Sequence, residues 1–425
     1  MINSSRVAAA SPRRNINRLW FAQSVSLVGL QTGSVAVPLL AVDVLQASAS
    51  QVALIGTLSS APWLVAPVIG TLFDRANRKR LLVVSHLARG LLWLSIPAAY
   101  LLGVLTLQQV WLVAGLVGLL GVVFVIGYRT FLPTIVAKAE LGAANGKMAG
   151  TDAVARATGP AAAGFLVQTL GSAWTILIQT ATSWAAAGAT VAIRPGSAAP
   201  SRARREGRSG RLAEWWRSVI DGFRCLHRIR PLRWLTLADT AYLFCFDVCF
   251  AVVVVFFRES LGISAVMIGV IFSVGSLGGI VGAALAHRLR VRAGFDVMIK
   301  VAAVLRGAGL IALPLGLLVP GGAVLAVLVA GRAINACAWS VYEVLSDTYQ
   351  QTVLPDDHRG SATAASLWLG NGAATLGATT AAVLAAVVDV AVLLAVAGIG
   401  AVAAGLISFL VDTGGRGERI SDERR

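Results

Sequence analysis

The sequence predicts an all-α membrane protein with twelve transmembrane helices in two six-helix bundles, and three observations support this fold class. The first is composition: of 425 residues, 57% are hydrophobic and only 13% are charged. A soluble domain carries about 25% charged residues, so an ordinary globular enzyme is excluded, and the apolar content excludes a disordered chain. The second observation is a series of long apolar segments, and the third is the distribution of Lys and Arg between them.

Each predicted transmembrane helix needs about 20 mostly apolar residues. Twelve segments satisfy this requirement: 18–45, 51–73, 81–103, 108–132, 146–168, 172–193, 232–257, 265–287, 298–318, 321–349, 361–386 and 389–411. They divide the chain into an N-terminal tail (1–17), a first bundle (18–193), a linker (194–231), a second bundle (232–411) and a C-terminal tail (412–425). Because the number of spans is even, both termini are expected on one side of the membrane.

The basic residues predict which side that is. Lys and Arg number 36 and Asp and Glu number 20, a net charge of +16. Most of this charge lies in the connections that share a side with the termini: Arg75, Arg78, Lys79, Arg80, Lys138, Lys147, the cluster in 194–233, Arg288, Arg290, Arg292 and Arg359. The opposite connections contain only Arg258. The positive-inside rule therefore predicts cytoplasmic termini in a cell membrane protein, and the charge needs no nucleic-acid partner.

The linker is the only long connection. Residues 196–211 are rich in Ser, Gly and Arg and are expected to be flexible. Apolar residues then recur at helical spacing, which predicts an amphipathic helix on the cytoplasmic interface: Leu212, Trp215, Trp216, Val219, Ile220, Phe223 and Leu226. A simple tether between the bundles is the alternative.

The two halves of the chain share three landmarks in the same order. Val52–Gly56 matches Ala265–Gly269, and Leu87–Gly90 matches Val304–Gly307. The third match joins Leu132-Pro133 to Leu354-Pro355. This order indicates two parallel repeats of six spans. It also makes Arg89 and Arg306 equivalent residues, for which a shared structural role is expected.

The connection between the second and third predicted spans carries a charged motif. Its residues are Gly70, Asp74, Arg75, Arg78, Lys79 and Arg80. A carboxylate there can cap a helix N-terminus, and the arginines can pair across the cytoplasmic mouth. The motif resembles the G-x-x-x-D-R-x-x-R-[RK] gating signature of the major facilitator superfamily; an ordinary positive-inside loop is the alternative. In the second half, His287 stands where the first has Asp74.

The fifth predicted span contains a second motif, made of Gly150, Gly159, Pro160 and Gly164. It is similar to the glycine–proline motif of antiporters in that superfamily, although Ala163 replaces one glycine. A proline in mid-span bends the helix, and a bend without directional meaning is the alternative. The segments 132–145 and 351–360 resemble macrolide-efflux and enterobactin-exporter-like members. The resemblance as a whole implies the drug:proton antiporter group.

Ionisable residues inside predicted spans are costly, and each is a functional hypothesis. Burial disfavours the charged form of a carboxyl group, so such a group can bind and release protons. The candidates for proton coupling are Asp247, Asp239, Glu343 and Arg332. A fixed ion pair between Asp247 and Arg332 is the alternative. Asp152 and Arg156 are four residues apart and can pair on one helix face, or they can lie near the substrate path.

Polar and aromatic residues near mid-depth complete the candidate substrate site, together with Asp152 and Arg156: Gln31, Trp63, Asn335, Trp339, Trp368 and Asn371. Such a cavity suits amphiphilic organic molecules. The chain lacks a Walker-type phosphate loop, a G-x-S-x-G motif and any metal-ligand spacing. Neither catalysis, a cofactor nor a metal is therefore expected.

These features predict a monomeric secondary exporter that moves small drug-like amphiphiles out of the cytoplasm by proton antiport. Siderophores, other secreted metabolites and lysolipids are alternative substrates. A receptor or assembly protein on the same fold is the alternative of another class, because fold alone does not establish function.

Overall fold

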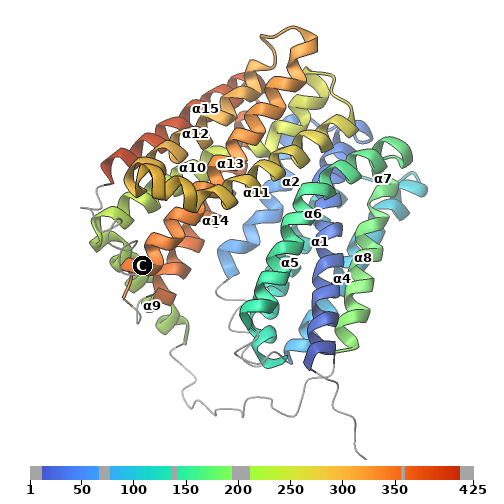
Figure 1. Ribbon diagram of the computed structural model, residues 1–425. Coiled ribbons are helices and arrows are strands. Elements are labelled where there is room, and N and C mark those ends of the chain that lie inside the picture. The colour runs from blue at the N-terminus through green and yellow to red at the C-terminus, as the bar shows by residue number, and fades with distance from the viewer. Residues whose placement is uncertain (1–11, 67–76, 136–140, 194–210, 356–358, 412–425) are drawn as a thin grey trace, which may run out of the picture.

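The computed structural model describes residues 12–66, 77–135, 141–193, 211–355 and 359–411. These residues form helices joined by short turns, in two groups that Figure 1 shows side by side. The N-terminal group contains α1 (Pro12–Asp43), α2 (Ala49–Ser60) with η1 (Ala61–Val65), α4 (Arg78–Leu101), α5 (Leu107–Ile135), α6 (Leu141–Leu170), α7 (Ser172–Thr175) and α8 (Leu177–Val191). The C-terminal group contains α10 (Arg230–Val255) with η3 (Phe256–Ser260), α11 (Ala265–Ala293), α12 (Phe295–Leu315), α13 (Gly321–Val353), α14 (Arg359–Leu384), and α15 (Val390–Leu406) with η4 (Ile407–Leu410).

Eight helices of the described residues are long and apolar enough to cross a membrane: α1, α4, α5, α10, α11, α12, α13 and α15. Helices also lie at the other four predicted spans, as α2, α6, α8 and α14. The described parts of α2 and α8 are short, with 12 and 15 residues. In α6, Lys147, Asp152 and Arg156 lower the apolar character, and α14 is rich in Gly, Ala, Ser and Thr.

Side chains at helix starts explain several boundaries. The Ser48 hydroxyl accepts from the backbone N–H of Gln51, whose side chain in turn accepts from the Ser48 N–H. Ser264 caps α11 by accepting from Met267 N, and Asp389 caps α15 by accepting from Ala391 N. Each cap satisfies a backbone donor that the first helical turn leaves free. These local signals fix where α2, α11 and α15 begin.

Among the described residues, the two most extensive contacts between the groups lie where α6 packs against α11 and where α2 packs against α14. At the first crossing, Gly164 lies against the backbone of Ala265, and Gly269 lies against the backbone of Pro160. Any side chain at either glycine would overlap the opposite backbone. At the second crossing, Gly56, the repeat equivalent of Gly269, makes only ordinary contact with Ala378. The α6–α11 crossing is therefore the tighter of two related contacts.

Three polar contacts join the two groups at one end of the molecule, here called the Asp43 end because α1 finishes there. Arg258 Nε donates to Asp43 Oδ1 at 2.8 Å. The Ser50 hydroxyl donates to the carbonyl of Ala382, and Val266 N donates to Gln168 Oε1 at 3.4 Å. These bonds link the ends of α1, α2 and α6 to those of α10, α14 and α11.

The helix predicted in the linker is present as α9 (Arg211–Arg228), below the C-terminal group in Figure 1. Two of its described apolar residues, Phe223 and Leu226, pack against the C-terminal group, whereas Ile220 is exposed. The Phe223 ring meets the Trp368 ring edge-on, with centroids 6.1 Å apart, and Leu226 is buried with Leu232 and Leu235. Residues 220–228 therefore pack against α10 and α14. The position of this helix at the cytoplasmic interface stays a prediction.

The close approach at Gly164 predicts opposite effects of one substitution at two glycines of α6. Gly164→Ala should lower the thermal stability of the purified protein by about 1 kcal/mol, because the new methyl group overpacks the contact with Ala265. Gly150→Ala should raise it by about 0.5 kcal/mol, because nothing lies within 4 Å of the new methyl group and Ala favours a helix over Gly. Thermal unfolding in detergent measures both, and equal shifts would contradict the tight crossing.

Candidate functional site

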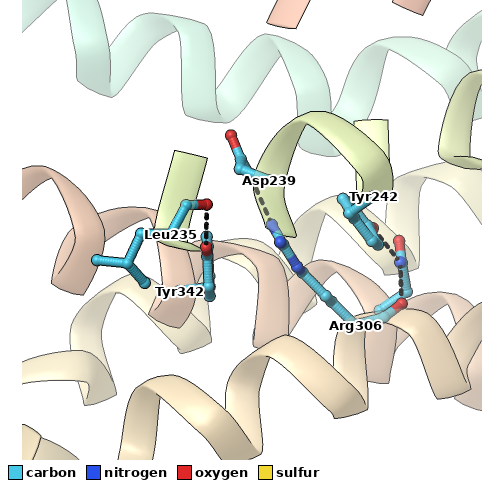
Figure 2. Close-up of polar contacts among 6 residues, drawn as sticks. Leu235, Asp239, Tyr242, Arg306 and Tyr342 are labelled. Atoms are coloured by element: carbon cyan, nitrogen blue, oxygen red, sulfur yellow. Dashed lines mark hydrogen bonds and ion pairs between the residues drawn. The ribbon is translucent and has the colours of Figure 1, made fainter. Parts of the chain in front are cut away.

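The C-terminal group contains a fully buried guanidinium group, that of Arg306 on α12. Its NH1 donates to Asp239 Oδ1 on α10 at 2.7 Å. The guanidinium carbon lies 4.0 Å from the ring centroid of Tyr242 and 3.6 Å from that of Tyr342. Figure 2 shows the side chain reaching across to Asp239, with one ring on each side. A buried charge requires a partner of this kind, and the aromatic faces add cation–π attraction.

Hydrogen bonds hold the surroundings of Arg306 in place (Figure 2). Asn335 Nδ2 donates to the Tyr242 hydroxyl at 2.8 Å and to the carbonyl of Arg306 at 2.7 Å. The Tyr342 hydroxyl donates to the carbonyl of Leu235 at 3.2 Å. The side chain of Asp239 is 43% exposed while that of Arg306 is 0% exposed. The ion pair therefore links a guanidinium group that solvent does not reach to a carboxylate that solvent does reach.

The equivalent residue of the first half, Arg89 on α4, is also buried. Among the described residues, its Nε has no hydrogen-bond partner, and neither ring nitrogen of the neighbouring His86 has one. No described carboxylate forms an ion pair with Arg89. The two halves therefore share a buried arginine at this position but differ in its charge partner.

The ion pair between Asp247 and Arg332, which was the alternative to a role in proton coupling, is not formed in the structure. Arg332 NH1 donates instead to the amide oxygen of Asn335 on its own helix. Asp247 is half-buried, its Cβ lies against Gly377 of α14, and it has no hydrogen-bond or ion-pair partner among the described residues. The reason is helix geometry. Asp247 is rotated by about 100° from Phe246, and the Phe246 ring faces Trp339 on α13, 4.7 Å away.

The other charged candidates lie nearer the protein surface. Asp152 and Arg156 form an ion pair of 2.7 Å on α6, as their spacing allows. Glu343 is exposed on α13, within electrostatic range of Asp239 and of Arg156 from the other group. The structure thus gathers Asp239, Glu343 and Arg156 in one region, and places Asp247 separately against α14.

The polar and aromatic candidates fall into two sets and two separate residues. Trp339 packs against Tyr242 and Phe246 and joins the Asn335 network. Trp368 Nε1 donates to the carbonyl of Leu64 at 3.3 Å, which brings it close to η1, where Trp63 lies. The Asn371 amide donates to the carbonyl of Leu367 within α14 at 2.8 Å. Gln31 is buried on α1 against Gly159 of the same group.

The two sequence motifs are only partly described. Gly70, Asp74 and Arg75 lie outside the described residues, as does the side chain of Arg78. Lys79 Nζ donates to the carbonyls of Val191 and Ile193, both at 2.7 Å, which places a cation at the C-terminal end of α8. Arg80 N donates to the Asn77 side chain at the start of α4. In the second motif, Gly164 contacts the other group, Gly159 contacts its own, and Pro160 lies inside α6.

Sequence reasoning missed two features. The Ser273 hydroxyl on α11 accepts from Ala161 N at 2.9 Å, directly after Pro160. A pocket lined by aromatic rings lies inside the C-terminal group, and its residues include Phe246, Phe250, Phe257 and Phe272. These phenylalanines are ordinary members of apolar spans, so nothing in the sequence separates them from lipid-facing residues. The described residues contain no group of three His, Cys, Asp or Glu that could hold a metal ion.

Membrane-length helices in two packed groups, with buried charges inside each group, define a multi-pass membrane protein. The family model of the Major Facilitator Superfamily matches residues 19–378, and the chain therefore belongs to this superfamily of membrane transporters. A search of curated proteins finds no matching relative.

Solved structures of transporters show the same fold. The chain is similar to the nucleoside transporter NupG, with 11% identity, a TM-score of 0.71 and coverage of 95% of this chain and 99% of that one. It is similar to a bacterial homologue of the iron transporter ferroportin in an inward-facing state (15% identity, TM-score 0.70, coverage 94% and 98%). A bacterial homologue of the human lysosomal transporter Spinster, also inward-facing, gives 13% identity, a TM-score of 0.63 and coverage of 95% and 96%.

The Arg306–Asp239 pair predicts a stability difference between two Asp→Asn variants. Asp239→Asn should destabilise the protein by about 2 kcal/mol, because it leaves a buried guanidinium without its counter-charge. Asp221→Asn removes the carboxylate from an exposed pair with Arg224 on α9, 3.1 Å long. It should cost less than about 0.5 kcal/mol. Thermal unfolding in the same detergent compares them; an effect at Asp239 no larger than that at Asp221 would show that the pair is dispensable.

Proposed function

We propose that the protein is a secondary active exporter that moves small amphiphilic organic molecules out of the cytoplasm in exchange for protons. The observation that carries this proposal is Asp247, a half-buried carboxyl group in a membrane helix with no described charge or hydrogen-bond partner. The proposed protein has twelve spans, works as a monomer in the cell membrane and has both termini in the cytoplasm. The drug:proton antiporter group is the part of the superfamily that fits this activity.

Alternating access has support from the contacts between the two groups of helices. The proposed topology puts the Asp43 end outside the cell, where Asp43–Arg258 and the tight α6–α11 crossing hold the groups together. With this topology, the described contacts hold the outer end closed, as an inward-facing conformation requires. Opening to the outside requires these contacts to separate, and an exposed ion pair of this type contributes less than about 1 kcal/mol. A contact of that strength can break in each transport cycle.

Proton coupling has support from the environment of Asp247. An isolated carboxyl group in an apolar setting is more stable when protonated, and a change in its surroundings changes its proton affinity. Asp239 is a weaker candidate because its charge is held by Arg306. In the proposed cycle, the surface between α10 and α14 faces the two sides of the membrane in turn. Asp247 binds a proton while it faces one side and releases it while it faces the other. A membrane potential of 100 mV supplies about 2.3 kcal/mol for each proton that enters.

The substrate class has support from the rings that line the interior of the C-terminal group. Aromatic faces bind flat apolar bodies and tolerate differences in shape. Nucleosides and iron are named for the transporters of similar structure, and these substrates are not assigned to this protein. Siderophores, other secreted metabolites and lysolipids also combine apolar and polar parts, and they belong in the substrate panel.

Replacing the carboxyl group tests the coupling. In proteoliposomes with a pH gradient, Asp247→Asn should abolish substrate-triggered proton flux and uphill accumulation, because an amide binds no proton in this range. Exchange of labelled substrate without a gradient should persist. Glu259→Gln, an exposed position at the end of the same helix, is the matched control. The probes are a panel of amphiphilic cations, neutral compounds and anions, with lumenal pyranine reporting protons.

Two results would contradict the proposal. Retained coupling in Asp247→Asn would show that Asp247 is not the proton-coupling residue. The variants Asp239→Asn and Glu343→Gln would then be measured in the same assay. Failure of the parent protein to move any member of the panel would favour a non-transporting receptor or assembly role.

The proposed topology predicts which positions an impermeant thiol reagent reaches from outside intact cells. In a variant whose 4 cysteines are replaced by serine, Gln108→Cys should be labelled. Ser201→Cys and Arg78→Cys should be labelled only after the cells are permeabilised, because positively charged connections stay in the cytoplasm. Labelling of Ser201→Cys in intact cells would reverse the orientation.

A further inference from the structure

Helix α14 packs against α10 of its own group and against α2 of the other group. Gly377 faces α10: a methyl group there would overlap the carbonyl oxygen of Phe244 and lie 3.2 Å from the Cβ of Asp247. Ala378, the next residue, is buried and lies against Gly56 of α2. Two consecutive residues of α14 therefore connect the position of Asp247 to the contact between the two groups.

The absence of a side chain at Gly377 allows this close approach. A side chain there would meet helix backbone, which cannot rotate away, so α14 would have to move away from α10. Gly372 on the same helix is different, because a methyl group there would meet only Leu64 Cδ2, at an ordinary distance of 3.7 Å. The distance between α10 and α14 therefore depends on Gly377 and not on Gly372.

The helices that pack closely on this part of α10 bring no described charge to Asp247. α2, α15 and η4 contain no titratable side chain. In α14, Arg359 is the first residue, at the end remote from Gly377. On α10 itself, the titratable groups nearest in sequence are the thiols of Cys245 and Cys249.

The charged groups on the other neighbours of α10 are paired or lie at distant helix ends. Asp43 of α1 is paired with Arg258, and Arg306 of α12 is paired with Asp239. Glu259 is exposed in η3, twelve residues beyond Asp247, and α9 ends before α10 begins. The remaining charged residues of α1 and α12 lie in the first two turns of those helices: Arg13, Arg14, Arg18, Asp296 and Lys300.

Ionisation of Asp247 therefore conflicts with the contact at Gly377. A half-buried carboxylate without a counter-charge needs water or another donor, whereas the protonated group does not carry this cost. Ionisation favours separation of α14 from α10, and protonation favours their contact. A proton can shift the equilibrium between two conformations when it binds one of them more tightly. Because Ala378 lies against α2, the same movement of α14 changes the contact between the groups.

We propose that Gly377 is a positioning residue for Asp247. It allows α14 to pack against α10 while the carboxyl group is protonated, and through Ala378 it transmits the change on ionisation to the α2–α14 crossing. The inference deepens the proposed function by naming how the proton acts on the helices, and it rests on that function for the claim that Asp247 exchanges a proton.

The first test is infrared spectroscopy of the purified protein in lipid at low pH. The carbonyl stretch of protonated Asp247 is identified as the band that is lost in Asp247→Asn. Gly377→Ala should shift this band to lower frequency, because separated helices admit water that donates to the carbonyl. Gly372→Ala is the matched control and should keep the band at the parent frequency.

The second test is transport in proteoliposomes, which separates positioning from a general loss of structure. Gly377→Ala should lower the number of protons moved per substrate at least threefold, while gradient-free exchange of labelled substrate stays within twofold of the parent. A merely structural defect would lower both rates together. Gly372→Ala should keep both at the parent level.

A third measurement keeps the proposal testable if Gly377→Ala fails to fold. Amide hydrogen exchange of the peptide that contains Gly377 is compared between the parent and Asp247→Asn, which is neutral at every pH. At high pH the parent should exchange at least threefold faster, because its ionised carboxylate separates the helices. At low pH the two should exchange equally. Both proteins are measured at the same pH, so the intrinsic exchange rates cancel.

An unchanged carbonyl band in folded Gly377→Ala, or equal hydrogen exchange of the parent and Asp247→Asn at high pH, would overturn the assignment. The spectra and the hydrogen exchange need neither substrate nor gradient. The expected results in a protein that transports nothing would therefore uphold the role of Gly377 and reject the exporter. Proton-coupled transport with an unchanged band in Gly377→Ala would do the reverse.

Discussion

Burial of the Arg306 guanidinium group is the constraint on which the polar interior of the C-terminal half depends. A charge with no access to water needs a counter-charge and aromatic or hydrogen-bonding neighbours. Asp239, Tyr242 and Tyr342 supply them from α10 and α13. Asn335 binds the carbonyl of Arg306 and at the same time accepts from Arg332. Through Asn335, the hydrogen bonds around Arg306 therefore also set the orientation of the Arg332 side chain.

A second constraint is the close approach of α6 and α11. Gly164 and Gly269 allow the two backbones to touch, and Ser273 takes the N–H of Ala161 beside Pro160. Small residues let membrane helices approach closely where lipid offers no hydrophobic driving force. This crossing and the Asp43–Arg258 pair join the halves near the same end of the molecule. A tight crossing with weak polar contacts beside it suits two bodies that move relative to one another.

The two halves share a scaffold and differ in their chemistry. Arg89 and Arg306 are both buried, but only Arg306 has a carboxylate partner among the described residues. Gly56 and Gly269 both face a helix of the other half, but only Gly269 is in backbone contact. The aromatic pocket lies in the second half. A duplicated bundle can keep its packing while each copy acquires different buried charges, because packing depends on shape and charge compensation depends on a few side chains.

The sequence by itself determined the helical membrane fold, the positions of the helices and the family. Long apolar segments have few alternatives to a helix in lipid, and caps such as Ser264 and Asp389 act within one turn of the chain. It also located the charged residues Asp239, Asp247, Arg306 and Arg332, since a charge stands out in an apolar span. Only the tertiary structure decided how they pair: Arg306 with Asp239, Arg332 with Asn335, and Asp247 with none of the described residues. The sequence likewise did not determine which phenylalanines line the pocket. Pairing and lining depend on the rotation of each helix against neighbours distant in the chain, and a span that is apolar on all sides carries no signal of that rotation.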